Sequence, residues 1–136
     1  MIVFNLNGKE AQVDCDPIDR LSNILRYQLG LTGTKVGCNA GDCGSCTIIL
    51  DENLCCSCLI PMGQIEGSDV MTIEGFGDGY VLSTMQQAFL DYGASQCGIC
   101  IPGMVVSAEW LYRNTLHPKE KDIEDTLGGV LCRCTG

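Results

Sequence analysis

Large apolar residues recur at every second position in residues 2–6, which is the period of a β-strand with one buried face. Asn7-Gly8 follows directly, and this pair favours the two-residue type I′ turn of a β-hairpin. Residues 9–13 are therefore predicted to return as the second strand of an N-terminal hairpin.

The apolar spacing changes to that of a helix after this hairpin. Asp16 and Pro17 suit the cap and the first turn of a helix, because aspartate accepts hydrogen bonds from free N–H groups and proline has none to satisfy. Apolar residues then recur every three or four positions up to Leu29, and Gly30 stands where a C-terminal glycine cap belongs. The pattern predicts a helix that begins at Pro17 and ends at Leu29.

Three further strand segments are predicted downstream. Residues 47–50 and 54–60 form a second strand pair around a short polar turn, and residues 70–73 form a fifth strand. A hairpin, a helix and more strands make a small α+β unit, which we assign to residues 1–75. Residues 76–136 are left as a second domain.

Only helical patterns follow the glycine-rich stretch 75–79, which we interpret as a joint between the two domains. Ser83 and Gln86 form a capping-box pair at the start of one helix, and a second helix is predicted to begin at Pro102. A third helix is predicted over residues 120–127, where two glycines halt it. The second domain is therefore expected to be a small helical bundle.

The composition narrows the class of protein. The chain has 136 residues and is 46% hydrophobic, which is enough for a packed core and argues against disorder. Its formal net charge is −9, from 17 acidic and 8 basic residues, so binding to nucleic acid is disfavoured. No apolar run approaches the length of a membrane span, and residues 1–7 lack the features of an export signal. These features predict a cytoplasmic protein that does not bind nucleic acid and has no membrane span.

Eleven cysteines are present, and their odd number without an export signal favours metal ligands over a secreted disulfide scaffold. Cys38, Cys43 and Cys46 are spaced Cys-x4-Cys-x2-Cys, and Cys58 follows twelve residues later. This is the ligand spacing of a plant-type [2Fe–2S] cluster. Intervening glycines suit such a loop, because they let backbone N–H groups turn toward the sulfur atoms.

A second group of cysteines lies in the helical half. Cys97 and Cys100 form a Cys-x2-Cys pair just before a predicted helix, and Cys132 and Cys134 form a Cys-x-Cys pair. Four cysteines in two close pairs suit either zinc or an iron–sulfur cluster, and the spacing alone leaves both open. The plant-type motif in the same chain favours a second iron–sulfur cluster.

Three cysteines fall outside both groups. Cys15, Cys55 and Cys56 are interpreted as buried structural thiols. Cys56 shares a face of the predicted strand with Cys58, so strand geometry alone does not choose the fourth ligand between them. The single histidine, His117, is interpreted as a solvated loop residue, and a Rieske centre would need two histidines.

Five segments make the chain closely resemble the iron–sulfur subunit, or N-terminal domain, of the molybdenum hydroxylases, the xanthine dehydrogenase and aldehyde oxidoreductase family. In the first half they are Leu-Gly-Leu-Thr-Gly-Thr-Lys-Val-Gly-Cys (29–38), Gly-Asp-Cys-Gly-Ser-Cys-Thr (41–47) and Ser-Cys-Leu (57–59). In the second half they are Gln-Cys-Gly-Ile-Cys-Ile-Pro-Gly-Met (96–104) and Leu-Cys-Arg-Cys-Thr-Gly (131–136). The resemblance covers nearly the whole chain.

The resemblance implies an N-terminal β-grasp, plant-type ferredoxin-like domain followed by a small four-helix-bundle [2Fe–2S] domain. It implies that the ligands of the first cluster are Cys38, Cys43, Cys46 and Cys58. It implies that the ligands of the second cluster are Cys97, Cys100, Cys132 and Cys134.

The resemblance also implies partners. A large subunit would bind the molybdenum as molybdopterin, expected here as molybdopterin cytosine dinucleotide, and a medium subunit would bind FAD. Gln96 and the backbone near Cys134 are implied to contact the pterin. Electrons from the molybdenum site would cross the second cluster and then the first, and would reach FAD or another acceptor. The expected assembly is a hetero-oligomer such as a dimer of heterotrimers.

Two residues depart from the family pattern. Ile101 and Val130 stand where threonine and asparagine are often found. Neither is an implied ligand, so these departures bear on contacts to the pterin or to partner subunits. The apolar face around Met104 is predicted to contact the molybdenum subunit.

We therefore interpret the chain as the electron-transfer subunit of a xanthine dehydrogenase-like oxidoreductase. The chain itself is expected to be non-catalytic, since no acid–base or nucleophilic group of residues stands out. The alternative is a free-standing ferredoxin-like carrier, which would leave Gln96 and the helical domain without a role. A zinc-stabilised interaction module is a third interpretation, and the first cysteine loop argues against it.

Overall fold

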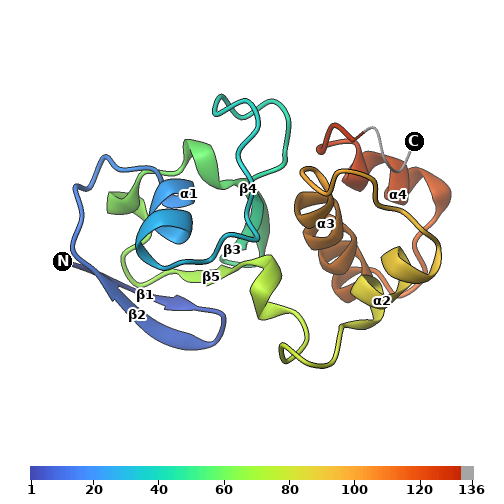
Figure 1. Cartoon of the computed structure of the whole chain (residues 1–136), viewed down its shortest axis with the longest axis horizontal. Coiled ribbons are helices and arrows are strands. Elements are labelled where there is room, and N and C mark those ends of the chain that lie inside the picture. The colour runs from blue at the N-terminus through green and yellow to red at the C-terminus, as the bar shows by residue number, and fades with distance from the viewer. Residues whose placement is uncertain (133–136) are drawn as a thin grey trace.

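A computed structural model describes residues 1–132 and shows a mixed five-stranded sheet followed by a group of helices (Figure 1). The strand order is β2-β1-β5-β3-β4, with β1 and β5 parallel and every other neighbouring pair antiparallel. The strands are β1 (Ile2–Leu6), β2 (Lys9–Val13), β3 (Thr47–Leu50), β4 (Asn53–Cys56) and β5 (Asp69–Met71).

The predicted N-terminal hairpin is confirmed. Strands β1 and β2 pair in antiparallel register, with Ile2 opposite Val13. Asn7 and Gly8 both adopt positive φ, at 52° and 80°, as a type I′ turn requires. The local turn chemistry therefore sets the register of the hairpin.

The first helix is shorter than the sequence predicted. Helix α1 (Leu21–Asn23) begins four residues late and continues as a single π-helical turn, Ile24–Gln28. The carboxylate of Asp16 accepts the N–H of Ile18 and so stabilises a local turn rather than the helix. Ile18, predicted on the apolar face of this helix, is therefore 79% exposed.

The core of the first half lies between this helix and the sheet. It consists of ten buried residues: Ile2, Phe4, Val13, Leu21, Ile24, Leu25, Ile48, Met62, Ile65 and Val70. Removing these apolar surfaces from water stabilises the first half as one packed unit.

The predicted strand at residues 54–60 ends early. Strand β4 stops at Cys56, and residues Ser57–Leu59 form a 3₁₀ turn, followed by two more such turns at Met62–Gln64 and Ile73–Gly75. The backbone N–H and the hydroxyl of Ser57 both donate to the carbonyl of Cys46, which turns the chain out of the sheet. Cys56 and Cys58 therefore do not share one face of a strand.

Three α-helices lie in the second half within the described residues: α2 (Thr84–Asp91), α3 (Ile101–Asn114) and α4 (Glu120–Leu127). The capping box of α2 is confirmed, with Gln86 N–H donating to Ser83 Oγ and Ser83 N–H donating to Gln86 Oε1. Pro102 lies in the first turn of α3, and α4 has the predicted bounds. The two-domain α+β fold is confirmed.

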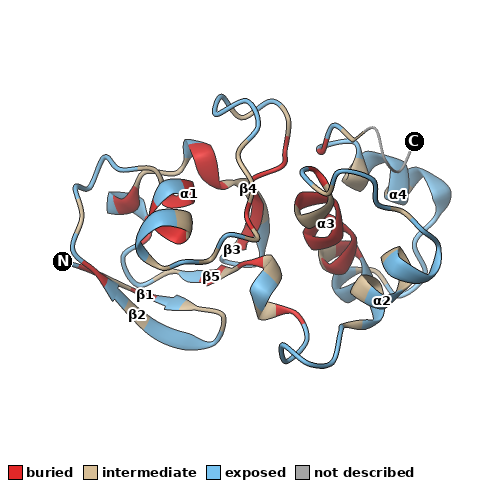
Figure 2. Cartoon of the chain, in the orientation of Figure 1, coloured by how far each residue is buried: buried red, intermediate tan, exposed pale blue. Residues whose placement is uncertain are grey.

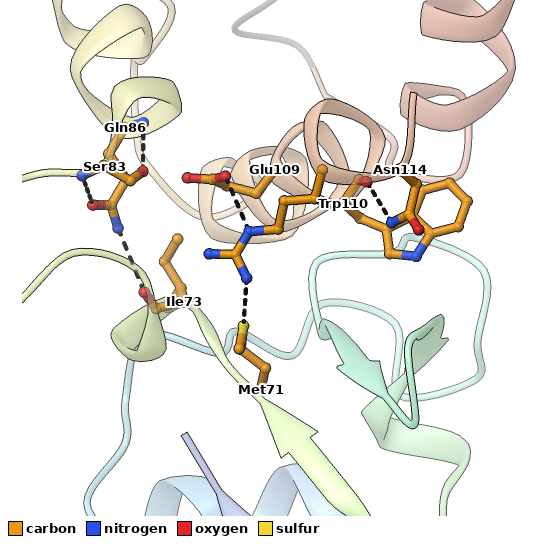
Figure 3. A network of polar contacts seen from close by, with 8 residues as sticks. Met71, Ile73, Ser83, Gln86, Glu109, Trp110 and Asn114 are labelled. Atoms are coloured by element: carbon orange, nitrogen blue, oxygen red, sulfur yellow. Dashed lines mark hydrogen bonds and ion pairs between the residues drawn. The ribbon is translucent and has the colours of Figure 1, made fainter. Parts of the chain in front are cut away.

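The two halves pack against each other through α3, whose residues 103–109 are all buried (Figure 2). Val106 joins Ile49 of β3 and Phe76 in a second apolar cluster. Polar contacts surround that cluster. Trp110 Nε1 donates to the carbonyl of Glu52 at 2.7 Å. The Gln86 amide donates to Ile73 O at 3.4 Å (Figure 3).

A charged side chain completes this interface. The guanidinium of Arg113 lies 3.7 Å from Glu109, 3.5 Å from the sulfur of Met71 and 4.9 Å from the ring centre of Phe76. These contacts tie α3 to the end of β5 and to the joint between the domains. Within residues 1–132, no helix has the length and apolarity needed to cross a membrane.

Candidate iron–sulfur centres

The first cysteine loop wraps its backbone around sulfur atoms. The Sγ atom of Cys38 accepts backbone N–H groups from Ala40 at 3.3 Å, Asp42 at 3.2 Å and Cys43 at 3.3 Å. Such a concave set of N–H groups stabilises negative charge, here that of a thiolate. The loop is therefore built for an anionic sulfur.

Cys43 is the most acidic thiol in this loop for which a shift is resolved. Its sulfur lies 3.3 Å from the N–H of Cys38 and 3.1 Å from the hydroxyl of Ser45. Burial raises the pKa of Cys43, but hydrogen bonds from Ser45 and Cys38 outweigh that effect and lower the pKa to about 6.

Cys46 and Cys58 form a second, buried sulfur pair. Their exposed fractions are 2% and 1%. The pKa of Cys58 is raised to about 11, mainly by burial and secondly by the hydrogen bond between the two thiols. Burial also raises the pKa of Cys46. Hydrogen bonding from the backbone of Cys58 to Cys46, and from that of Gly41 to Cys58, partly offsets this rise in pKa. Because both pKa values are raised, both thiols keep their protons near neutral pH in the absence of metal, and metal binding would displace those protons.

The described residues do not form a site for a single metal ion. Within residues 1–132, no three His, Cys, Asp or Glu side chains converge in a way that would hold one metal ion. Hydrogen bonds instead link the four cysteines in two pairs, Cys38 with Cys43 and Cys46 with Cys58, and the thiol of Cys56 also contacts that of Cys46. This arrangement fits a binuclear cluster with two thiolates on each iron, and it fits mononuclear zinc poorly.

The second cysteine group is only partly within the described residues. Cys100 is the N-cap of α3, and its sulfur lies 2.8 Å from that of Cys132. Cys97 is exposed on the loop that precedes them, and Gln96 beside it is exposed as well. Cys134, the fourth implied ligand, lies outside the described residues.

Apolar side chains line the inner side of this second group. Cys100, Met104 and Val130 form a buried cluster, in which Met104 is 4% exposed. The prediction that Met104 contacts a partner subunit is therefore wrong, because one turn of α3 places its side chain beneath Cys100 rather than on the surface. Met104 is a core residue.

The two cysteine groups approach each other closely. The N–H of Leu131, next to Cys132, donates to the carbonyl of Cys43 at 2.8 Å. Gly103 of α3 and Gly44 of the first loop meet backbone to backbone, since a Cβ built at Gly103 would overlap the oxygen of Gly44. One hydrogen bond therefore joins a loop that carries ligands of one proposed centre to a segment that carries ligands of the other.

The remaining cysteines are only half-buried. Cys15 and Cys55 are in intermediate positions, and burial raises the pKa of both thiols. Cys56 lies beside the first loop, with its sulfur 3.8 Å from the carbonyl of Gly41. His117 is exposed in the loop before α4, as predicted.

Sequence reasoning missed one residue of the first centre. Arg20 donates from Nη1 to the carbonyl and the side-chain oxygen of Asn39, at 2.7 and 2.9 Å, and to the carbonyl of Cys58 at 3.0 Å. No spacing rule relates an arginine eighteen residues upstream to Cys38, so only the folded chain reveals this contact.

Comparisons with known proteins relate both halves of the chain to iron–sulfur binding domains. Residues 4–83 match the family model of the 2Fe-2S iron-sulfur cluster binding domain, and residues 72–136 match that of the [2Fe-2S] binding domain. The chain is 44% identical to a probable xanthine dehydrogenase subunit of Bacillus subtilis, covering 98% of this chain and 76% of that protein. It is 40% identical to the nicotinate dehydrogenase small FeS subunit of Eubacterium barkeri, covering 99% and 86%.

Solved structures give the same result. The structure superimposes with a TM-score of 0.94 on quinoline 2-oxidoreductase from Pseudomonas putida 86, at 39% identity over 99% of this chain and 83% of that one. It superimposes equally well, at 39% identity, on the aldehyde oxidoreductase of Desulfovibrio desulfuricans, where it spans 98% of this chain and 15% of that longer one. The chain belongs to the iron–sulfur subunits of the molybdenum hydroxylase family.

Proposed function

We propose that this chain holds two [2Fe–2S] clusters and conducts electrons between a molybdenum-binding partner and an acceptor partner. The two clusters would supply one-electron carriers, and the chain itself would bind, shield and connect them. Electron transfer within a molybdenum hydroxylase is the function that the homologous small subunits support. The ligand set, the direction of transfer and the acceptor are our proposal.

The single observation that carries the proposal is the hydrogen-bonded pairing of the three cysteines of the first loop and Cys58. Cys38 with Cys43 would hold one iron, and Cys46 with Cys58 the other. The backbone N–H groups directed at these sulfurs would stabilise the thiolates and raise the reduction potential of the centre.

In the helical domain, Cys97, Cys100 and Cys132 would hold the second cluster together with Cys134. The contact of 2.8 Å between the sulfurs of Cys100 and Cys132 supports a shared site. The hydrogen bond from Leu131 to Cys43 supports direct coupling between the two centres, because it joins their ligand-bearing segments without intervening side chains.

The partner-facing surface is proposed to lie at the second centre. Gln96 and Cys97 are exposed there, together with the apolar side chains of Ile99 and Leu131. Gln96 would reach the pterin, as would the backbone near Cys134, and a molybdopterin cytosine dinucleotide on the large subunit is the expected form. Electrons would then leave by way of the first centre toward FAD on a medium subunit.

We further propose that the complex is xanthine dehydrogenase-like and acts on a purine or another heterocycle. The relatives named for xanthine, nicotinate and quinoline enzymes support a heterocyclic substrate, whereas the aldehyde oxidoreductases support an aldehyde. A dimer of heterotrimers and a cytoplasmic location stay predictions.

Metal analysis of the protein purified with its natural partners tests the proposal. We expect about four irons per copy of this chain together with molybdenum, as two [2Fe–2S] clusters require. Iron without molybdenum or partners would instead support the free-standing ferredoxin-like carrier. Zinc in place of iron would contradict both interpretations and support an interaction module. Substrate screening of the same preparation identifies the heterocycle or aldehyde.

A further inference from the structure

Arg20 occupies a position in the first centre that the ligand set does not explain. It is half-buried, and its backbone is fixed by a β-bridge to Pro61, three residues beyond Cys58. The guanidinium reaches from there across to the cysteine loop, where Nη1 contacts Asn39 and the carbonyl of Cys58. One side chain therefore joins the loop of the first three proposed ligands to the segment of the fourth.

The contact holds the loop in an uncommon conformation. Asn39 directly follows Cys38 and adopts a φ of 57°, in the left-handed region that residues other than glycine seldom occupy. Arg20 donates to both the backbone and the side-chain oxygen of Asn39. It thus stabilises the turn that aims the N–H groups of Ala40 and Asp42 at the sulfur of Cys38.

Among the described residues, neutral oxygen atoms accept the hydrogen bonds of the Arg20 guanidinium. Within residues 1–132 the acceptors of its guanidinium are two backbone carbonyls and one amide, and no carboxylate forms an ion pair with it. An arginine side chain stays protonated at every physiological pH. A permanent positive charge is therefore held beside the first centre.

We propose that Arg20 is a positioning residue that stabilises the reduced state of the first cluster through this charge and holds its loop in place. A [2Fe–2S] core with four thiolates is anionic, and one-electron reduction adds a further negative charge. A nearby positive charge favours the reduced form and raises the reduction potential, most strongly where water is partly excluded. The inference rests on the proposed ligands Cys38 and Cys58.

Arg26 provides a matched control. It is also a half-buried arginine, and its Nη1 also donates to two backbone carbonyls, those of Thr32 and Thr34. These acceptors lie before the cysteine loop, and no contact joins Arg26 to Asn39 or Cys58. Arg26→Gln removes the same charge and the same kind of hydrogen bonds from the neighbouring segment.

The experiment is a redox titration of the complex purified with its partners, followed by electron paramagnetic resonance. The signal of the first cluster is identified by its loss in Cys38→Ala. At a fixed potential, Arg20→Gln is expected to lower the ratio of reduced to oxidised first cluster about tenfold, equivalent to about 59 mV for a one-electron couple. Arg20→Lys, which keeps the charge, and Arg26→Gln are expected to change that ratio less than about threefold.

A second readout tests the positioning role. Arg20→Gln is expected to lose iron from the first centre to a chelator faster than wild type, whereas Arg26→Gln keeps the wild-type rate. If the reduction potential of the first cluster is unchanged in Arg20→Gln, or shifts equally in Arg26→Gln, the proposed role of Arg20 is overturned. The proposed function of the chain is not affected by that result. If Arg20→Gln retains no first cluster, Arg20→Lys decides: a potential within about threefold of wild type supports the role, and a tenfold shift overturns it.

Failure of the proposed function has a different signature. If the wild-type complex shows no iron–sulfur signal that Cys38→Ala removes, the ligand set is wrong, and the role of Arg20 falls with it. A signal that depends on Cys38 but not on Arg20 leaves the proposed function intact.

Discussion

At the scale of single residues, the first centre contains two kinds of thiol that differ in their readiness to lose a proton. Cys43 lies among hydrogen-bond donors that lower its pKa to about 6, whereas burial, and then the hydrogen bond with the Cys46 thiol, raises the pKa of Cys58 to about 11. The more exposed sulfur pair is therefore prepared for metal, whereas the buried pair must release a proton to bind it.

This difference predicts the order of chemical modification in the metal-free protein. At pH 7, Cys43 is about nine-tenths thiolate and reacts with iodoacetamide long before Cys58, because the thiolate is the nucleophile. The rate at Cys43 is expected to fall about tenfold from pH 7 to pH 5, as the thiolate is protonated across its pKa of about 6. Mass spectrometry of quenched samples measures both rates.

Ser45→Ala and denaturant supply the controls for this measurement. Removing the hydroxyl that contacts Cys43 Sγ raises the pKa of that thiol toward its ordinary value and slows the reaction at pH 7. In denaturant, Cys43 and Cys58 should react at similar rates. Equal rates in the folded protein would contradict the hydrogen-bonding account of the loop.

At the scale of elements, local signals determined some ends of helices and strands, and long-range contacts determined others. The cap of α2 is a local signal, since Ser83 and Gln86 satisfy each other's backbone N–H groups within one turn. The start of the first helix is not local, because Leu21 N–H bonds to Ile60 O and Asp19 O accepts from Met62. These distant partners override the proline and aspartate that predicted an earlier start.

The capping box yields a stability prediction. Ser83→Ala removes the acceptor for the N–H of Gln86 and should lower the free energy of unfolding by about 1 kcal/mol. Ser95→Ala is a matched control at an exposed position, where a change below about 0.5 kcal/mol is expected. Denaturant unfolding followed by circular dichroism measures both values. Equal effects of the two substitutions would show that the cap contributes nothing.

At the scale of the whole molecule, the two domains meet where the two cysteine groups meet. Gly103 of α3 lies against Gly44, and Gly44 adopts a φ of 74° with Gly129 directly beside it. A side chain at Gly103 would separate α3 from the cysteine loop, and a side chain at Gly44 would overlap the backbone of Gly129 and Val130. Close packing of two backbones therefore brings Leu131 within hydrogen-bonding distance of Cys43.

This contact predicts an unusual response to alanine. Gly103→Ala should raise the intrinsic helix stability of α3, yet we expect it to destabilise the protein by about 1–3 kcal/mol, because the added methyl overlaps the oxygen of Gly44. Gly129→Ala has only one ordinary contact, at 3.8 Å, and should change stability by less than about 0.5 kcal/mol. Thermal unfolding and iron content of both variants measure the effect. A stabilised Gly103→Ala variant would contradict the close approach.

The sequence alone was sufficient for features whose partners lie close together along the chain. Three such features are the hairpin at Asn7-Gly8, the cap at Ser83 and the cysteine loop. Each one spans only about ten residues, so residue type and spacing are enough to predict its geometry. The ligand spacing and the family resemblance also indicated an iron–sulfur subunit, and the relatives confirm that family.

Features that depend on distant residues were set by the folding of the whole chain. Long-range contacts end the strand before Ser57 and bury Met104 in the core. They also bring Leu131 into contact with Cys43, and Arg20 into contact with Asn39 and Cys58. Each of these depends on hydrogen bonds or burial between segments many residues apart. The spacing of residues along the chain does not predict such pairs, because the pairs form only when the core and the two domains pack.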